Sequence, residues 1–227
     1  MSNPSVTIPL EHPGGIVSAI CAHGEFVFTG GDAGTIRVWK PAGGGTTFEG
    51  VAELAGHTGK ILSLTVSTIT PEGILVSTSV DGSARVWNMA AGGTLMQTLN
   101  DHAGQWVFDA KEMPMEGVGN TLNTCGLDNS VKVYKAGGAG WEALHSQPCQ
   151  GKVTRLLSTT SAKGETILAA AQTNGEIVLF NGSAQFAIMG TLPGHPVVDD
   201  VVALEGVDGV LIVSGASDGI LRVFQWA

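Results

Sequence analysis

The sequence has few basic residues, and this shortage excludes several functions. Lys and Arg total 11 against 20 Asp and Glu, which gives a formal net charge of −9. The basic residues are scattered, so the converging cations that grip a phosphate backbone are missing. The composition therefore argues against direct nucleic-acid binding and against docking on anionic membranes, and a neutral or basic protein partner fits better. No run of about 18 apolar residues occurs, so no membrane span is expected.

Cysteine is also scarce. Cys21, Cys125 and Cys149 are odd in number and lack the spacing of a metal site, which predicts buried thiols in a reducing compartment and neither metal nor cofactor. The segment Met1 to Leu10 has no basic region followed by an apolar core, so secretion is not indicated. We expect an intracellular protein, in the cytoplasm or the nucleus.

Glycine and short apolar segments are abundant instead. The chain of 227 residues contains 33 Gly, 43% hydrophobic residues and only 14% charged residues. This mixture favours many short buried strands joined by tight turns over a charged helical protein. No Pro/Ser-rich or charged linker divides the chain, so residues 1–227 are expected to form a single domain.

A short polar turn followed by a strand ending in an aromatic residue occurs five times. The closing aromatics are Trp39, Trp87, Tyr134, Phe180 and Phe224, at steps of 48, 47, 46 and 44 residues. A nearly fixed step of this size marks a repeat protein whose units bury their faces against each other. The copies span approximately residues 6–39, 48–87, 94–134, 141–180 and 185–224.

The second copy shows what one unit contains. An apolar run at 61–66 is followed by a Pro-Glu-Gly turn, a strand at 74–79, an Asp-Gly turn and a strand that ends at Trp87, and a fourth strand follows at 94–99. Such short strands with reversals between them predict a four-stranded antiparallel meander. Sheets of this kind, repeated along a chain, are the blades of a β-propeller, so the predicted fold is an all-β propeller of five four-stranded blades.

The second copy resembles the signature of the WD-repeat β-propeller superfamily. Gly56 and His57 are followed by Ser77, Asp81 and Trp87 at the family's positions, and the resemblance extends from about Val6 to Trp226. In that family these side chains form a hydrogen-bonded chain inside each blade, which implies structural rather than catalytic roles here. The residues implied in this structural network are His57, Ser77, Asp81, Trp87, His102, Thr124, Asp128, His195, Ser214 and Asp218.

The other copies keep this pattern in part. The first has His12, Thr29 and Trp39 but Ala33 at the Asp position, with Asp32 beside it. The fourth has Cys149, Ala170, Asn174 and Phe180 at the four positions, so its network is essentially lost. We expect the fourth blade to be held by apolar packing and to be the least rigid of the five.

Within the superfamily, the run of copies is similar to the propeller region of plant-type proteins that join Cys-Cys-Cys-His zinc fingers to WD repeats. The similar segments are residues 30–39, 99–102 and 219–226. Three dispersed cysteines cannot build the zinc fingers, so a nucleic-acid role implied by that group is not transferred.

Two arrangements of the blades remain open. Residues 5–10 resemble the outer strand that precedes each later His, and the chain stops after the third strand of the fifth copy. The N-terminal segment could therefore complete the last blade and close a five-bladed ring, which is the arrangement we favour. WD-repeat rings most often have seven blades, however. An incomplete larger ring would leave edges for another chain or for self-association.

The predicted function is a non-catalytic scaffold for protein–protein interaction. The loops that lead from each His into the next inner strand line one face of such propellers, and the candidate partner-binding residues on them are Lys60, Gln105, Trp106, Lys152 and Asp199. Trp106 is the best anchor because Trp is enriched at binding hot spots, although it could equally pack inward. The alternatives are an obligate subunit whose partner completes the ring and, more weakly, an RNA-associated adaptor. No catalytic motif occurs, so the protein is not expected to be an enzyme.

Overall fold

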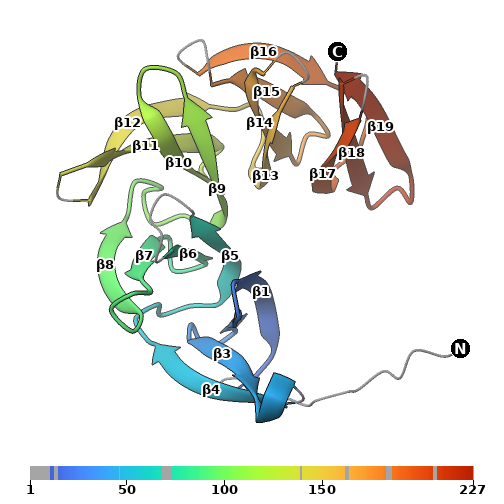
Figure 1. The fold of residues 1–227 in the computed structure, drawn as a ribbon. Helices are drawn as coiled ribbons and strands as arrows, with labels where there is room; N and C mark the ends of the chain where they lie inside the picture. Colours follow the sequence, from blue (N-terminus) through green and yellow to red (C-terminus); the bar gives the residue numbers. More distant parts are fainter. Residues whose placement is uncertain are drawn as a thin grey trace, which may run out of the picture.

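The structure, a computed structural model, describes residues 11–226 except 13–14, 46, 68–72, 139, 162–163, 183–185 and 207–208. Over these residues the chain forms 19 strands and one short 3-10 helix, arranged as five antiparallel sheets. The all-β fold and the five-blade count predicted from the repeat are confirmed. We number the blades 1 to 5 in chain order (Figure 1).

The strands follow one another in each blade from the inner to the outer edge. Blade 1 contains β1 (Val17–His23), β2 (Phe26–Gly31), β3 (Ile36–Ala42), the 3-10 helix η1 (Gly43–Gly45) and β4 (Thr47–Leu54). Blade 2 contains β5 (Ile61–Ser67), β6 (Ile74–Ser79), β7 (Ala84–Asn88) and β8 (Thr94–Leu99). Blade 3 contains β9 (Val107–Met115), β10 (Gly119–Gly126), β11 (Ser130–Gly137) and β12 (Gly140–Pro148). Blade 4 contains β13 (Val153–Thr160), β14 (Thr166–Gln172), β15 (Ile177–Asn181) and β16 (Ala187–Leu192). Blade 5 contains β17 (Val198–Gly206), β18 (Gly209–Ala216) and β19 (Leu221–Trp226).

Every inner strand carries a register shift at the same place. In blade 1 Val17 pairs with Gly31 and Ala19 with Gly30, so Ser18 is the extra residue, and the equivalent shift lies at Leu62, Phe108, Thr154 and Asp199. A β-bulge bends its strand and increases the local twist. Repeated in each blade, it gives the five inner strands a common geometry and lets their residues be compared position by position.

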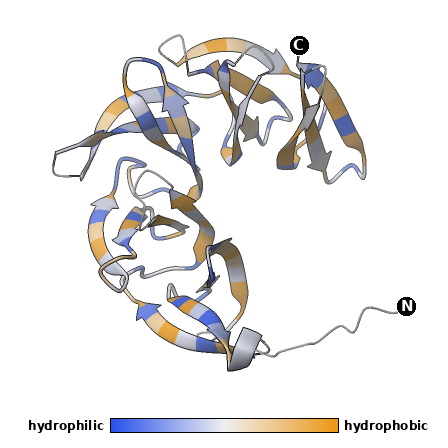
Figure 2. Ribbon diagram, in the orientation of Figure 1, coloured by the Kyte–Doolittle hydropathy of each residue, from blue (hydrophilic) through white to orange (hydrophobic). Residues whose placement is uncertain are grey.

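The core lies between the blades. One apolar cluster joins each pair of neighbouring blades: Ile36 and Val38 of blade 1, for example, lie in a cluster with Ile61 and Leu64 of blade 2. The apolar strand residues stand out in Figure 2. Because one blade buries only one face against each neighbour, the sheets depend on each other for stability, as expected of a repeat protein.

The five blades form an open arc. Successive inner strands contact each other from β1 to β17, whereas blades 1 and 5 face each other across a gap in Figure 1. The prediction of a closed five-bladed ring is therefore wrong for the described residues, because the packing at the four blade interfaces sets a curvature that keeps the two ends apart. Residues 5–10, predicted to complete the last blade, lie outside the described residues, and the blade 5 sheet has three described strands.

Candidate protein-binding face

The polar network of blade 2 joins four side chains. His57 Nδ1 lies 2.8 Å from Asp81 Oδ2 and His57 Nε2 lies 2.8 Å from Ser77 Oγ, while Trp87 Nε1 donates to the same Ser77 Oγ over 2.9 Å. The turn after β6 places Asp81, and its carboxylate also accepts hydrogen bonds from Thr58 N and Ser83 Oγ. The network thus ties the loop before β5 to strands β6 and β7.

Blades 3 and 5 contain partial versions of this network. His102 bonds Asp128 Oδ1 at 2.9 Å and Thr124 Oγ1 at 2.8 Å, while the Tyr134 hydroxyl donates to Asp101 instead. In blade 5 His195 lies 2.7 Å from Ser214 Oγ but 3.4 Å from Asp218, whose carboxylate accepts a hydrogen bond from Arg222 at 2.9 Å. Phe224 offers no donor at the Trp position.

Blades 1 and 4 use other contacts. Trp39 Nε1 donates to Thr29 Oγ1 at 2.8 Å, but His12 Nε2 lies against the Thr29 carbonyl rather than against a carboxylate. In blade 4 Gly151 N donates to Gln172 Oε1, and Phe180 stacks on Phe186 with ring centroids 4.6 Å apart. Apolar packing therefore replaces the polar chain in blade 4.

The Ser77–His57–Asp81 arrangement has the order of a catalytic triad, but its surroundings give a substrate no access. Ser77 is fully buried and its oxygen already accepts the Trp87 N–H. Burial lowers the pKa of His57 even though Asp81 favours its charged form. Burial by itself would raise the pKa of Asp81, but hydrogen bonds from Ser83 and His57 outweigh it and lower that pKa. A neutral His held between two satisfied partners is a structural element.

The face at the mouth of the central channel brings together two of the predicted binding residues. Lys60 and Asp199 both line a cavity of about 450 Å³, together with Phe108 and Arg155. Below it, residues of all five inner strands line a further cavity of about 710 Å³. Sequence reasoning missed Phe108 and Arg155. Phe108 immediately follows Val107, and Arg155 lies two residues after Val153. These positions in the repeated inner strand are the signal that could have found them.

Trp106 lies beside this mouth and is exposed. Its side chain is 47% exposed, and its ring meets the edge of the Phe108 ring with centroids 6.2 Å apart. Trp106 therefore does not pack inward. Gln105 and Lys152 are exposed too, and Lys60 forms an ion pair with Asp32 at 2.9 Å. Lys60 is thus part of a charged pair at the boundary of blades 1 and 2.

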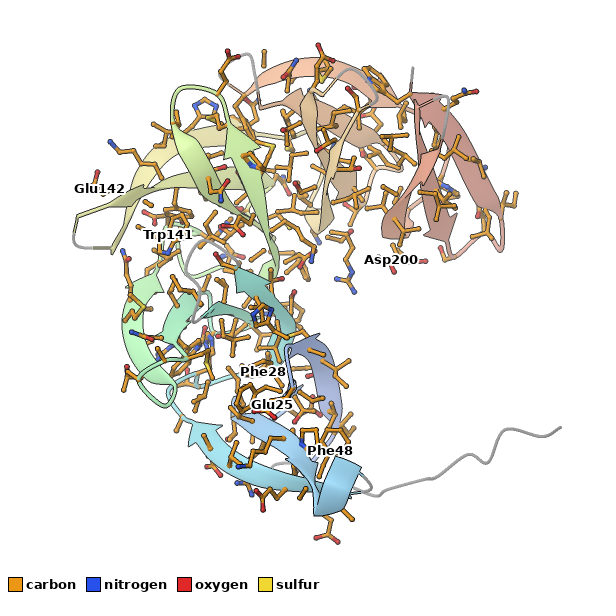
Figure 3. All side chains as sticks on the ribbon, in the orientation of Figure 1. Glu25, Phe28, Phe48, Trp141, Glu142 and Asp200 are labelled. Atoms are coloured by element: carbon orange, nitrogen blue, oxygen red, sulfur yellow. The ribbon has the colours of Figure 1, made fainter. Side chains whose placement is uncertain are left out.

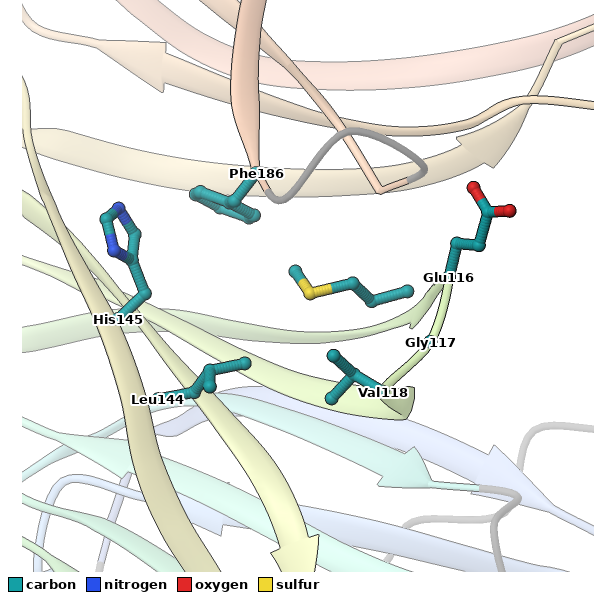
Figure 4. A pocket seen from close by; sticks show the side chains of 7 residues that line it. Glu116, Gly117, Val118, Leu144, His145 and Phe186 are labelled. Carbon is teal, nitrogen blue, oxygen red and sulfur yellow. The ribbon is translucent and has the colours of Figure 1, made fainter.

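A second hollow lies on the rim between blades 3 and 4. It measures about 420 Å³ and is lined by Met115, Glu116, Gly117, Val118, Leu144, His145 and Phe186 (Figure 4). No signal in the sequence indicated this hollow, because most of its residues lie in the loop after β9, on outer strand β12 and at Phe186, which do not follow the repeat. Among the described residues no group of three or more His, Cys, Asp or Glu side chains could hold a metal ion. No helix in that part of the chain is long and apolar enough to cross a membrane.

An all-β chain of successive antiparallel blades whose inner strands lie side by side in an arc defines a β-propeller type of protein. The WD40 family, described as "WD domain, G-beta repeat", matches residues 4–40 and 48–88. These matches cover the first two blades, and together with the five antiparallel sheets they support a WD-repeat β-propeller; WD40 domains generally mediate protein–protein interaction.

A solved structure shares the fold. The chain is similar to the computationally designed Ika8 protein, with a TM-score of 0.70 and 22% identity over 92% of this chain and 58% of that chain. This chain therefore spans little more than half the length of the structure it matches. No curated protein matches the sequence.

Proposed function

We propose that the protein is a non-catalytic scaffold that binds a protein partner at the mouth of its central channel. The observation that carries the proposal is the exposure of Trp106, a large aromatic side chain held on Phe108 next to the cavity that contains Lys60 and Asp199. Trp is among the residues enriched at interaction hot spots. The net charge of −9 favours a neutral or basic partner.

The test is a Trp106→Ala variant of the full chain, purified with an affinity tag from its own cells and compared with the unchanged chain. If Trp106 is a hot spot, its loss costs at least about 2 kcal/mol, and the partner should be retained roughly 30-fold less strongly. Met96→Ala is the matched control, because Met96 is 51% exposed but lies on outer strand β8. Equal retention by both variants would refute the proposed face.

A second candidate function is a subunit whose ring is completed by another chain. The specific observation that favours it is the open arc, in which blades 1 and 5 each lack a neighbour on one side (Figure 1). The two candidate functions rest on different observations, the exposure of Trp106 and the uncovered faces of blades 1 and 5. One protein could therefore combine an interaction face at the channel mouth with a partner at the open end.

A further inference from the structure

The four blade interfaces define which residues of a blade meet its neighbours. We call the side of a blade that faces the preceding blade its leading face, and the opposite side its trailing face. The leading face presents the first and fourth residues of the inner strand, such as Ile61 and Leu64. The trailing face presents the first and third residues of the motif Ile36-Arg37-Val38 and its equivalents. The described arc leaves one face of each kind uncovered: the trailing face of blade 5 and the leading face of blade 1.

The trailing face of blade 5 exposes residues that are buried in every other blade. Leu221 is 73% exposed and Val223 is 60% exposed. The residues at the position of Leu221 are Ile36, Ala84, Val131 and Ile177, with exposures of 0%, 1%, 0% and 0%. Those at the position of Val223 are Val38, Val86, Val133 and Leu179, with exposures of 2%, 0%, 0% and 0%. Blade 5 therefore keeps the apolar side chains of a blade interface although no blade covers them.

The leading face of blade 1 likewise exposes residues that are buried in every other blade. Ile20 is 69% exposed and Val17 is 44% exposed. The residues at the position of Ile20 are Leu64, Ala110, Leu156 and Val201, with exposures of 6%, 0%, 2% and 6%. Those at the position of Val17 are Ile61, Val107, Val153 and Val198, and all four are fully buried. Isolated apolar residues on a surface are ordinary, but pairs at interface positions on both ends mark interaction surfaces.

The carboxylate of Asp200 on blade 5 is also positioned to bond a neighbouring blade. In blade 3 Asp109 accepts Ala110 N at 2.9 Å with Oδ1, and its Oδ2 accepts Leu156 N of blade 4 at 3.1 Å. Asp200 has the same position after the bulge, and its Oδ1 accepts Val201 N at 2.9 Å. Its side chain is 71% exposed, with Arg155 at 3.8 Å, and it lies on the concave side of the arc (Figure 3). By analogy with Asp109, Asp200 can accept the backbone N–H of a following inner strand.

The surroundings of the turn glycines also show that the trailing face of blade 5 is uncovered. Gly34, Gly82 and Gly175 lie in the turn before the third strand, and a Cβ on each would meet backbone atoms of the next blade. For Gly82 the nearest such atoms belong to Gly104, at 2.7 Å. Gly219 is the equivalent residue of blade 5, and nothing lies within 4 Å of its Cβ position. The space that a following blade fills at three internal interfaces is open at blade 5.

We propose that a second polypeptide, folded as propeller blades of the same type, binds between blades 5 and 1. This proposal rests on the second candidate function and names the chemistry of its partner. The partner would place apolar inner-strand residues on Leu221 and Val223, donate a backbone N–H to Asp200, and cover Ile20 with its own trailing face. A second copy of the chain fits less well. The arc in Figure 1 already bends back toward its start, so five more blades of this curvature would run into blade 1.

The test places a photo-crosslinking amino acid, p-benzoylphenylalanine, at position 223 of the full chain in its own cells. We expect a crosslinked product in which the captured peptide comes from an inner strand or its neighbour in a WD-type blade of another protein. Leu221→Asp in the same chain should reduce this product at least tenfold. Asp200→Ala should reduce it several-fold, whereas Asp200→Asn, which keeps an acceptor oxygen, should retain most of it.

The matched control carries the crosslinker at position 188. Ile188 is 57% exposed, close to the 60% of Val223, but it lies on outer strand β16. It should give no such product. A crosslink from position 223 to β1 of the same chain would show that the arc closes on itself, and a crosslink to a second copy would show self-association. Either result, a captured segment that is not a propeller blade, or no product would overturn the proposal.

The two proposals can fail separately. Partner retention that depends on Trp106 but comes without a crosslink at position 223 would refute the blade-completing partner alone. Leu221 is 73% exposed in the arc, so Leu221→Asp should leave the chain folded. Its circular dichroism and its Trp106-dependent partner retention should match those of the unchanged chain.

Discussion

The Ser77 hydroxyl bonds two atoms, His57 Nε2 and Trp87 Nε1, that have no other hydrogen bond among the described residues. With His57 Nδ1–H donating to Asp81, Nε2 accepts the Ser77 O–H, and Ser77 Oγ accepts the Trp87 N–H. Ser214 of blade 5 serves only His195, because the aromatic residue there is Phe224. The same residue type in the same repeat position therefore supports one buried group in blade 5 and two in blade 2.

Replacing these serines should destabilise the two blades to different extents. Each buried group left without a partner costs about 1–3 kcal/mol, so Ser77→Ala should lower the free energy of unfolding by roughly twice as much as Ser214→Ala. Urea unfolding of both variants, followed by Trp fluorescence, measures the difference. Equal losses would mean that the Trp87 hydrogen bond adds nothing to stability.

The carboxyl of Asp128 should make stability depend on pH. Burial would raise the pKa of Asp128, but hydrogen bonds from His102 and Ser130 outweigh it and lower the pKa from 3.8 to about 2. A pKa that is lower in the folded state stabilises the fold above the unfolded value, and this contribution is lost as the pH falls from about 4 to about 2. Asp128→Asn should be less stable at pH 5 but lose less on acidification to pH 2.5. Urea midpoints at both pH values test this, and parallel losses in variant and unchanged chain would contradict it.

At the scale of one element, the turn before the third strand has the same backbone in blades 2 and 5 but different neighbours. Gly82 has φ +87° and Gly219 has φ +75°, so an L-residue is strained at either position. Of these two glycines, Gly82 lies against the backbone of the next blade and Gly219 does not. Glycine is therefore required by the turn conformation in both blades, and in blade 2 also by packing against the next blade.

Alanine at these two glycines should show the difference. Gly219→Ala should cost about 1–2 kcal/mol from the left-handed conformation alone. Gly82→Ala should cost a further 1–3 kcal/mol or so, because its methyl group would push on Gly104. Denaturant unfolding of the two variants measures both losses. A Gly219→Ala loss as large as that of Gly82→Ala would show that another blade already covers blade 5.

At the scale of the whole molecule, the blades have unequal numbers of neighbours. Blades 2, 3 and 4 are covered on both faces, while blade 5 has an exposed trailing face and three described strands. In a repeat protein, stability is close to a sum of unit and interface contributions, so a terminal unit opens more easily. Blade 5 at the open end of the arc, and not blade 4 as the loss of its polar network predicted, is therefore where local unfolding should begin, because blade 4 is packed on both faces.

Amide hydrogen exchange can measure this gradient. We expect the amides of β18 and β19 to exchange through local opening and those of β9 to β11 only through larger unfolding, since blade 3 is packed on both sides. The β18 and β19 amides should become protected when a blade-completing partner binds. Uniform protection across blades 2 to 5 in the isolated chain would contradict the open arc.

Much of the fold could be predicted from local sequence signals. The second repeat predicts strands at 61–66, at 74–79, from the Asp81-Gly82 turn to Trp87, and at 94–99, and the structure places them at Ile61–Ser67, Ile74–Ser79, Ala84–Asn88 and Thr94–Leu99. Turn glycines and alternating apolar residues act over a few neighbouring positions, and the repeat supplies each signal several times. The rim hollow around Phe186 had no such signal, because it joins an outer strand of one blade to a loop of the next.

Local signals in the sequence were sufficient to predict the number and type of the repeats, the strand positions and the residues of the polar network. The exposure of Trp106 and the separation of the first and last blades followed only from the packing of the whole chain. Ile20 and Leu221 look the same in sequence as their buried equivalents, yet they are 69% and 73% exposed. The reason is physical: strand and turn preferences are local, whereas closure of the arc depends on the curvature accumulated over four blade interfaces, which no single repeat encodes.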